Sequence, residues 1–289
     1  MKNTLEKTKN IMRINNIKAN KRFGQNFLID DNILENIVKS AEITNNDLVI
    51  EIGPGLGNLT EYLLEKAAYV ILVEIDNNMI NILNDRFKNN NNNYILLNND
   101  ILKVNVDEII ENIENKLNRK FEKIKVVANL PYYITTPIIF KLLQNENRIN
   151  EITVMVQKEV AERIVAKNKT KDYGILTLMV NYLGTSDIKL IVPNNSFIPA
   201  PNVTSAVIKI TKNKRFTVKD EELLFKLIHS SFAQRRKKII NSLESTKFLN
   251  MSKPELEKLF NECNISLNAR AEELELQDYI KIVDIITNK

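Results

Sequence analysis

Between residues 30 and 157, apolar runs of strand length alternate with stretches that have the periodicity of amphipathic helices. The apolar runs are rich in Val, Ile and Leu, as buried strands are, and cover residues 47–53, 69–76, 94–100, 123–130 and 151–157. Helical patterns cover residues 30–43, 58–67, 78–87, 106–113 and 135–144. This alternation predicts βαβ units, and therefore an α/β fold with a mostly parallel sheet covered by helices on both faces.

The last third of the chain has a different pattern. Two extended runs flank a proline-rich loop within residues 187–212, which predicts a hairpin at the sheet edge. Beyond residue 212 only helical patterns remain, over residues 220–244, 252–263 and 274–287. We therefore expect an α/β domain over residues 1–212, with a flexible arm at 1–17, and a small all-α domain over residues 213–289.

The composition excludes several classes of protein. No apolar run approaches the ~18 residues of a membrane span, and the N-terminus lacks the apolar stretch of a signal peptide. Cys263 is the only cysteine and His229 the only histidine, so we expect no internal disulfide, no metal site and a reducing, cytoplasmic compartment. A net charge of +5 favours a polyanionic partner such as a nucleic acid.

A glycine-rich loop follows the first strand of the α/β region, in the sequence VIEIGPGLGNLTEYL. Gly53, Gly55 and Gly57 allow a sharp turn and let a ligand approach the backbone, and the next helix directs its free N–H groups to the same place. Asn58 or Thr60 can cap that helix. The spacing G-x-G-x-G differs from the dinucleotide fingerprint G-x-G-x-x-G, so the loop alone does not define the ligand.

Acidic residues at the ends of the next two strands narrow the class of ligand that the loop can bind. Glu74 ends the second strand, where a carboxylate can accept hydrogen bonds from both ribose hydroxyls of a nucleoside. Asp100 ends the third strand and precedes Ile101, where the pair can hold an adenine ring by its amine and one face. Either acid alone is equally well explained as a helix cap. On three successive strands, the glycine loop and both acids predict a nucleoside cofactor.

The fourth strand ends in the sequence VVANLPYYITTP, where a plain polar turn would suffice. Asn129 supplies an amide oxygen and Leu130 a backbone carbonyl, and Pro131 fixes their geometry. Two acceptors side by side suit an amine with two N–H donors, such as the exocyclic amine of adenine. Tyr132 offers a ring face on which a purine can stack. The alternative is a tight turn with packed tyrosines, and we adopt it only for Tyr133.

Such a pair of acceptors suggests a reaction. The adenine amine is a poor nucleophile because its lone pair is delocalised into the ring, and two acceptors outside the base plane favour a pyramidal nitrogen. The sequence offers no evident side-chain base for the neutral amine. We therefore expect direct displacement on a methyl sulfonium, with the proton lost to water after the transfer.

Basic residues form two candidate RNA-binding patches. Lys21 and Arg22 lie beside the segment before the first helix, and a second run comprises Arg235, Arg236, Lys237 and Lys238. The second run lies within a helical pattern, so its side chains fan out and cannot all contact the same phosphates. Its alternative is a solvated helix face. We favour phosphate contacts, which would position the RNA while the shape of the folded substrate supplies selectivity.

These motifs together resemble the KsgA/Dim family of ribosomal RNA adenine dimethyltransferases, which use S-adenosylmethionine. The resemblance covers nearly the whole chain from about residue 18. The segments that carry it are KRFGQNFLID (21–30), EIGPGLGNLT (51–60), VEID (73–76), NLPYYITTP (129–137), YGILTLMVNY (173–182), FIPAPNVTSAV (197–207) and FAQRRKKIINSL (232–243). Tyr133 occupies a position where many relatives have asparagine, and we expect the chemistry to be unaffected.

The resemblance implies a Rossmann-like class I methyltransferase domain and a helical domain that binds RNA. It implies two methyl transfers to each of two adjacent adenosines near the 3′ end of 16S ribosomal RNA in the small subunit, during ribosome biogenesis. By position, Asn26 and Leu28 help to close the cofactor site, and Gly53 lies against the methionine part. Asn129 lies between cofactor and target, and Phe197 forms a second aromatic wall for a flipped adenine, with hairpin core as its alternative. We expect a monomer by default.

Three other functions compete with this one. The Erm enzymes dimethylate large-subunit (23S) ribosomal RNA, confer macrolide resistance and share the cofactor motifs, but KRFGQNFL and FAQRRKKIINSL resemble KsgA more. A non-catalytic RNA-binding assembly factor would need none of Glu74, Asp100 and Asn129. A nicotinamide dehydrogenase is disfavoured by the glycine spacing and by the lack of an evident proton donor other than His229.

Overall fold

The computed structural model describes residues 2–20, 24–90 and 93–288, and the chain forms two compact units. The first unit contains the chain up to residue 161 together with residues 186–212. The second contains residues 162–185 together with the chain from residue 213 onward. The sequence predicts a division after residue 212, and the chain divides there, but residues 162–185 also belong to the second unit.

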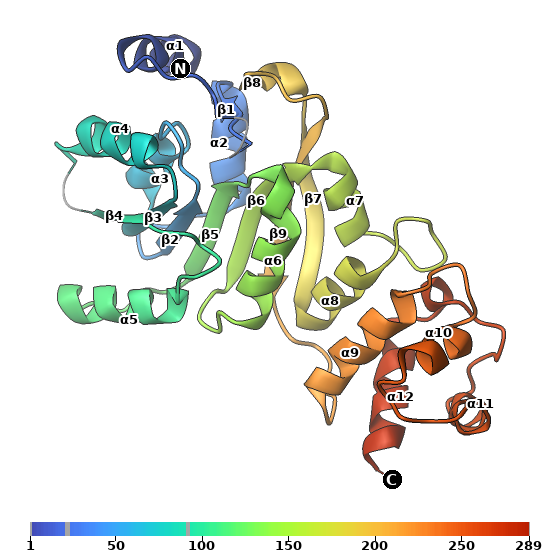
Figure 1. Ribbon diagram of the computed structural model, residues 1–289. Coiled ribbons are helices and arrows are strands. Elements are labelled where there is room, and N and C mark those ends of the chain that lie inside the picture. Colours follow the sequence, from blue (N-terminus) through green and yellow to red (C-terminus); the bar gives the residue numbers. More distant parts are fainter. Residues whose placement is uncertain (1, 21–23, 91–92, 289) are drawn as a thin grey trace. The chain divides into compact units, whose positions relative to one another are not determined.

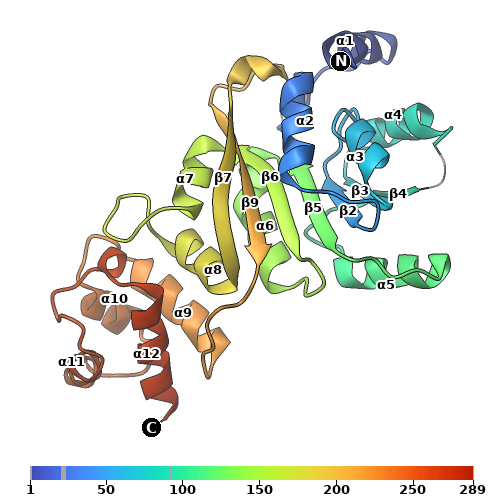
Figure 2. The same ribbon diagram turned by 180° about the vertical axis from the view of Figure 1, so that it is seen from behind.

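The first unit is built on a sheet, which has seven strands within the described residues, in the order β4-β3-β2-β5-β6-β9-β7 (Figure 1). The strands are β2 (Leu48–Ile52), β3 (Tyr69–Glu74), β4 (Tyr94–Asn98), β5 (Ile124–Asn129), β6 (Glu151–Gln157), β7 (Gly184–Val192) and β9 (Ser205–Lys212). The strands from β4 to β6 in this order are parallel, and β9 runs antiparallel beside β6 (Figure 2). The predicted sheet, with a hairpin at its edge, is therefore confirmed.

Helices connect the parallel strands, as the apolar periodicity predicts. They are α3 (Thr60–Lys66), α4 (Asn77–Phe87), α5 (Val106–Leu117) and α6 (Thr135–Gln144), while α2 (Asp31–Ser40) precedes β2 and α7 (Lys158–Ile164) follows β6. The Asp30 carboxylate caps α2 by accepting hydrogen bonds from two N–H groups of the first turn, and the Asp76 carboxylate caps α4 by accepting one. None of the helices in the described part of the chain is long and apolar enough to cross a membrane.

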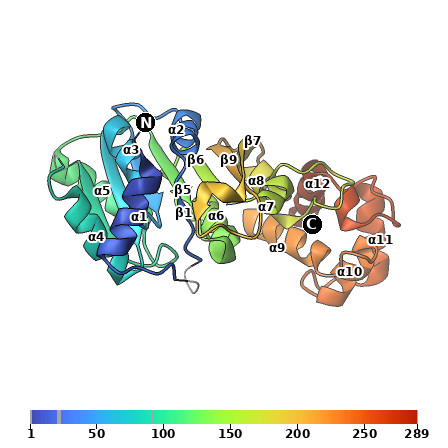
Figure 3. The ribbon, with the colours of Figure 1, turned by 90° about the horizontal axis from the view of Figure 1, so that it is seen from above.

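The segment expected to be a flexible arm contains a helix, α1 (Thr4–Ile14), which lies beside α4 (Figure 3). Ile11 and Met12 pack against a core cluster that includes Leu83 and Phe87 of α4. Apolar periodicity does not predict this helix, because its own sequence, TLEKTKNIMRI, is mostly polar. Its position therefore depends on contacts with the folded sheet unit rather than on a strong helical pattern.

The second unit is all-α within its described residues. Its helices are α8 (Ile175–Leu183), α9 (Glu221–Phe232), α10 (Ile239–Thr246), α11 (Lys253–Glu262) and α12 (Leu276–Thr287). α8 belongs to this unit because the fully buried Tyr182 packs edge-on against Phe225 of α9, with the ring centroids 5.6 Å apart. The hydroxyl of the buried Tyr279 donates to the Ala271 carbonyl at 3.0 Å, which satisfies the polar end of a core side chain.

The prediction that the basic run lies in a helix is wrong. α9 ends at Phe232 and α10 begins at Ile239, so residues 235–238 form the connection between two helices. The chain leaves the helical path because Lys238 forms an isolated β-bridge with Arg270, and the N–H of Ile239 donates to the Ala269 carbonyl at 2.9 Å. These contacts accompany the complete burial of Ile239 in the core.

A cluster of charged side chains is buried near the amino ends of β5 and β6. The ammonium group of Lys125, whose side chain is 3% exposed, lies 3.0 Å from the carboxylate of Asp47 and donates to the carbonyls of Ala41 and Glu42. The Glu151 carboxylate lies 2.7 Å from Lys123 and 3.1 Å from Lys209. Burial alone would raise the pKa of Glu151. The neighbouring ammonium groups outweigh that effect, so the pKa lies below its ordinary value. The cluster holds the end of the sheet opposite the cleft described below.

Candidate active site

A cleft opens at the carboxyl ends of β2, β3, β4 and β5, where the strand order reverses. It holds about 1050 Å³ of space outside the protein atoms, including the open solvent at its mouth. Almost every predicted cofactor and catalytic residue lines it: Asn26, Leu28, Gly53, Gly55, Glu74, Asp100, Asn129, Leu130, Pro131 and Tyr132. Residues distant in the sequence therefore meet at one edge of the sheet.

The glycine loop forms the floor of the cleft. Gly53 has φ +65°, a conformation that side chains disfavour, and a Cβ at this position would meet nothing within 4 Å. Gly55, at φ +57°, lies under the ring of Phe27, which a Cβ there would approach to 3.2 Å. The loop thus leaves open space beside one glycine and a close contact above the next, and a ligand can reach the backbone at Gly53.

Glu74 joins this loop to the end of β3. Its carboxylate accepts hydrogen bonds from the N–H groups of Gly55 at 3.1 Å, Ile75 at 2.8 Å and Asp76 at 2.9 Å. The side chain is 5% exposed, and burial raises its pKa although the three N–H donors oppose the shift. These bonds hold the carboxylate still at the cleft wall, where it can accept further hydrogen bonds from the hydroxyls of a ligand.

Glu51 is a second buried carboxyl on the cleft wall. Its role was not predicted from the sequence. Among the described residues, its one hydrogen-bond partner is the Thr60 hydroxyl, which donates to Oε2 at 2.6 Å. Burial raises the pKa of Glu51 to about 8, while the Thr60 hydrogen bond opposes the shift. Thr60 therefore serves this carboxyl rather than capping α3 as predicted.

Glu51 should make stability depend on pH in the cofactor-free protein. Its folded pKa of about 8 exceeds the ordinary 4.5, so the folded state keeps a proton that the unfolded state loses. The free energy of unfolding should therefore fall from about pH 5 to about pH 8, with a slope of at most about 1.4 kcal/mol per pH unit. Glu51→Gln should lack this decline. Urea unfolding of both proteins at several pH values is the measurement, and parallel profiles would contradict the prediction.

The acid after β4 also lines the cleft. Asp100 Oδ1 accepts from the N–H of Leu102 at 3.0 Å, which fixes the carboxylate at the turn. The buried Ile101 lies beside it on the same wall, and the partly exposed Ile75 projects from the end of the neighbouring strand. A carboxylate beside two aliphatic side chains suits a flat heterocycle that carries an amine.

The orientation of the Asn129 amide is fixed by the segment across the cleft, which comprises residues 24–28 and precedes α2. Its Nδ2 donates to the Asn26 carbonyl at 3.1 Å, so Oδ1 remains as an acceptor. The N–H of Leu130 donates to Met155 at 3.1 Å, and the Thr135 hydroxyl donates to the Pro131 carbonyl at 3.0 Å. Both bonds anchor the turn, and no described residue donates to the Leu130 carbonyl. Asn129 Oδ1 and the Leu130 carbonyl therefore lie at adjacent positions as two acceptors.

The two tyrosines of this turn differ from each other. Tyr132 is held by a 2.6 Å hydrogen bond between its hydroxyl and that of Ser205, and burial raises its pKa. Tyr133 is 58% exposed and lines the cleft, so its interpretation as core packing is wrong. Its ring passes over Gly24, where a Cβ would lie 3.4 Å from it. The absence of a side chain at Gly24 leaves room for the ring at the mouth of the cleft.

Phe197 is the site residue that the structure does not bring to the cleft. It begins the short strand β8 (Phe197–Ile198), which pairs antiparallel with β1 (Phe27–Leu28), and Phe197 lies opposite Leu28. Its side chain is 3% exposed and belongs to the hydrophobic core cluster. Its role as an aromatic wall stays a prediction that requires a rearrangement of β8.

The predicted phosphate-binding residues have unequal surroundings. Lys21 and Arg22 lie outside the described residues. Arg235 forms an ion pair with Glu272 at 2.7 Å, and Lys238 donates to the Asn268 side chain. Arg236 and Lys237 have no side-chain partner among the described residues. The connection between α9 and α10 thus presents two cations that are not already engaged.

Two contacts of the segment across the cleft were not predicted from the sequence. Gln25 Nε2 donates to the Asp76 carboxylate at 2.8 Å, and Asn58 Nδ2 donates to the Leu28 carbonyl at 2.8 Å. Asn58, expected as a helix cap, was visible as a polar residue after three glycines, but its partner lies 30 residues away. In residues 2–20, 24–90 and 93–288, no group of three or more His, Cys, Asp or Glu side chains could hold a metal ion.

The observed residues fit one cofactor class. A glycine with open space beside it, a fixed carboxylate at the end of β3 and an acid with aliphatic neighbours after β4 match the amino acid, ribose and adenine parts of an adenosyl cofactor. The parallel sheet with its antiparallel edge strand completes the architecture. The protein is a class I methyltransferase that uses S-adenosylmethionine.

The chain belongs to the ribosomal RNA adenine dimethylase family, whose sequence model matches residues 16–288. A protein from Lachnoclostridium phytofermentans named ribosomal RNA small subunit methyltransferase A is 47% identical over 93% of this chain and 92% of its own length. A protein of the same name from Clostridioides difficile is 42% identical over 98% and 96%. The resemblance predicted from the motifs is thereby confirmed.

Two solved structures are similar to this one. The crystal structure of a dimethyladenosine transferase from Plasmodium falciparum has a TM-score of 0.73 and 26% identity, and the match covers 91% of this chain and 98% of the other. The 23S ribosomal RNA methyltransferase ErmE has a TM-score of 0.65 and 22% identity, over 91% and 100% of the two chains. The second likeness concerns the fold alone.

Proposed function

We propose that this enzyme transfers methyl groups from S-adenosylmethionine to N6 of two adjacent adenosines near the 3′ end of 16S ribosomal RNA in the small subunit. Each adenosine receives two methyl groups. The observation that carries the proposal is the fixed amide of Asn129, whose Nδ2 is held by Asn26 while Oδ1 is left to accept. The names of relatives that are 42–47% identical supply the RNA substrate. The enzyme acts in the cytoplasm as a monomer during ribosome biogenesis.

The cofactor site uses side chains from successive strands. Gly53 and Gly55 contact the amino acid part, Glu74 accepts from the ribose hydroxyls, and Asp100 accepts from the adenine amine. Asn26 and Leu28, on the segment that crosses the cleft, close the site. When bound, S-adenosylmethionine supplies an electrophilic methyl group on a sulfonium.

The target amine is activated by position and polarity rather than by a base. Asn129 Oδ1 and the Leu130 carbonyl accept its two N–H groups from outside the base plane, which favours a pyramidal nitrogen with a free lone pair. The nitrogen–carbon bond forms as the sulfur–methyl bond breaks, and the proton leaves to water. Tyr132 stacks on the base, and its hydroxyl bond to Ser205 keeps the ring in place. The exposed Tyr133 stands at the entrance through which the base arrives.

The α9–α10 connection, residues 235–238, contacts RNA phosphates in this proposal. Replacing Arg236 and Lys237 by Gln should weaken RNA binding and flatten its dependence on salt by roughly one to two units of the log–log slope. Lys253→Gln with Lys258→Gln removes the same charge from exposed positions of α11 and should leave the slope nearer to that of the wild type. Filter binding at several salt concentrations measures both, and equal slopes for the two variants would place the RNA elsewhere.

The choice of substrate separates this proposal from its rivals. Labelled S-adenosylmethionine is incubated with the enzyme and either small-subunit particles or large-subunit ribosomal RNA. We expect label in the small-subunit RNA. Label only in large-subunit RNA would favour an Erm-type enzyme, and no transfer with intact binding would favour a non-catalytic assembly factor.

A further inference from the structure

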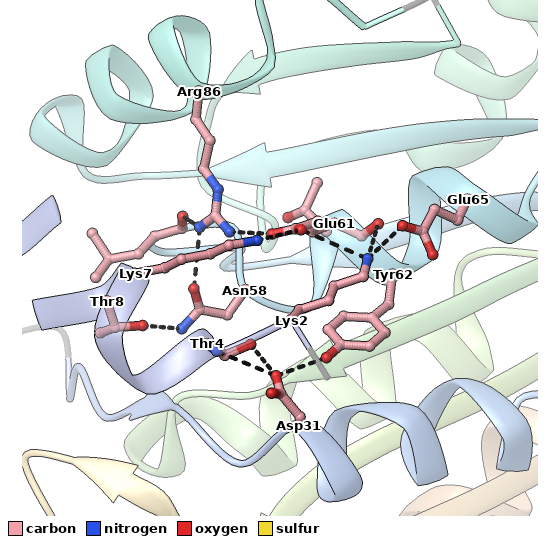
Figure 4. Close-up of polar contacts among 12 residues, drawn as sticks. Lys2, Thr4, Lys7, Thr8, Asp31, Asn58, Glu61, Tyr62, Glu65 and Arg86 are labelled. Carbon is pink, nitrogen blue, oxygen red and sulfur yellow. Dashed lines mark hydrogen bonds and ion pairs between the residues drawn. The ribbon is translucent and has the colours of Figure 1, made fainter. Parts of the chain in front are cut away.

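Helix α1 precedes the part of the chain that the family sequence model matches, yet it is docked on the methyltransferase unit by polar contacts (Figure 4). Lys7 lies 2.9 Å from the Glu61 carboxylate on α3, and Arg86 on α4 lies 2.6 Å from the same group. Burial raises the pKa of Glu61, but these two cations lower it more, so its pKa lies below the ordinary value. Lys7 thus ties α1 to α3, the helix that follows the glycine loop, and the Arg86 contact joins α4 to the same carboxylate.

One contact of α1 reaches the cleft itself. Thr8 is fully buried, and its hydroxyl oxygen accepts a hydrogen bond from Asn58 Nδ2 at 2.9 Å (Figure 4). The same Nδ2 donates its other hydrogen to the Leu28 carbonyl at 2.8 Å. Arg86 completes the set by donating to Asn58 Oδ1 at 3.1 Å. Every hydrogen-bonding atom of the Asn58 amide therefore has a partner, and Thr8 and Leu28 share its NH₂ group.

Leu28 belongs to the segment that closes the cleft. Asn58 and Leu28 both line the cleft, and the preceding Phe27 packs over Gly55. Without the Thr8 oxygen, one N–H of a buried amide would lack a partner. The amide would turn to find another acceptor, and its hold on the Leu28 carbonyl would loosen.

We propose that Thr8 is a positioning residue for the cofactor site, acting through the Asn58 amide to fix the segment of Leu28 over the glycine loop. The inference rests on the proposed placement of S-adenosylmethionine in this cleft. It assigns to α1 a role in cofactor affinity and none in the chemical step. It also predicts that the hydroxyl of Thr8, rather than its bulk, is what matters.

The test compares three variants of the full-length chain by titration with S-adenosylmethionine. Thr8→Val keeps the shape and removes the acceptor, and should weaken binding by about tenfold, which corresponds to about 1.4 kcal/mol. Thr8→Ser restores an oxygen and should recover most of the affinity. Thr4→Val is the matched control, because Thr4 is also buried on α1 but bonds to Asp31, which does not line the cleft.

Kinetics and thermal stability separate positioning from general damage. In Thr8→Val the KM for S-adenosylmethionine should rise while kcat at saturating cofactor and the KM for RNA stay near the wild-type values. Thr4→Val should lower the melting temperature by a similar amount without changing cofactor affinity. Wild-type affinity in Thr8→Val, equally weak binding in Thr8→Ser, or equally weak binding in Thr4→Val would each overturn the inference. Failure of the wild type to bind S-adenosylmethionine would instead overturn the cofactor site, and the inference with it.

Discussion

Asn129→Ala should lower the rate of methyl transfer by roughly 100- to 1000-fold, the loss seen when one fixed group that stabilises a transition state is removed. The variant lacks Oδ1, one of the two acceptors that we propose favour the pyramidal amine. It also loses the hydrogen bond to Asn26, so a small decrease in cofactor affinity is expected as well. Single-turnover measurements at saturating S-adenosylmethionine and RNA isolate the chemical step from both binding steps.

Thr135→Val is the control for damage to the same turn. It removes the hydroxyl that donates to the Pro131 carbonyl but leaves both acceptors in place, and should cost no more than about tenfold. RNA affinity should be unchanged in both variants, since neither alters a charge. Near wild-type turnover in Asn129→Ala would refute the role of the amide oxygen.

Lys125→Ala should destabilise the sheet unit by about 3–5 kcal/mol, the cost of leaving a buried charge without its partner. Asp47 lies 3.0 Å from the Lys125 ammonium and is almost completely buried, so water cannot replace the lost cation. The carbonyls of Ala41 and Glu42 would lose their donor at the same time. Urea unfolding followed by circular dichroism gives the free energy.

Lys123→Ala is a matched comparison, because Lys123 precedes β5 and also pairs with a carboxylate of the same cluster. Its side chain is 47% exposed, so solvent screens the lost contact with Glu151, and the expected cost is about 1 kcal/mol or less. Equal costs for the two variants would show that burial does not set the value of the Lys125 contacts.

The α/β architecture could be predicted because buried parallel strands and amphipathic helices have different periodicities. Runs such as YVILV, residues 69–73, show no polar face, which only a strand covered on both sides can tolerate. The break between α9 and α10 could not be predicted in the same way. The helical period of residues 220–244 continues through the basic run, and the contacts of Lys238 and Ile239 with residues 269–270 that interrupt it are not local.

The cleft residues could be predicted for a similar reason. The carboxyl ends of neighbouring parallel strands meet at one edge, so Gly53, Glu74, Asp100 and Asn129 were bound to lie close together. The direction of individual side chains was harder to predict from the sequence. Tyr133 is exposed at the cleft mouth, whereas Phe197 is buried against the segment of Leu28, and no local pattern distinguishes these two aromatic residues.

The docking of α1 could not be predicted from the sequence, because it depends on contacts between residues that are far apart in the chain. Thr8 meets Asn58, and Lys7 meets Glu61, across about fifty residues. A polar helix of this kind is stable only where the folded unit supplies partners for its buried hydroxyls. The contact of α1 with the cleft runs through Asn58, which bonds to both Thr8 and Leu28.

The most direct test of the central claim is to map the methylated bases. Small-subunit particles that lack the modification are treated with enzyme and S-adenosylmethionine, and the 16S ribosomal RNA is analysed by primer extension and by mass spectrometry of its nucleosides. We expect N6,N6-dimethyladenosine at two adjacent positions near the 3′ end, and none when Asn129→Ala is used for the same short reaction time. Methylation at another position or on another atom, or methylation of large-subunit RNA alone, would contradict the account.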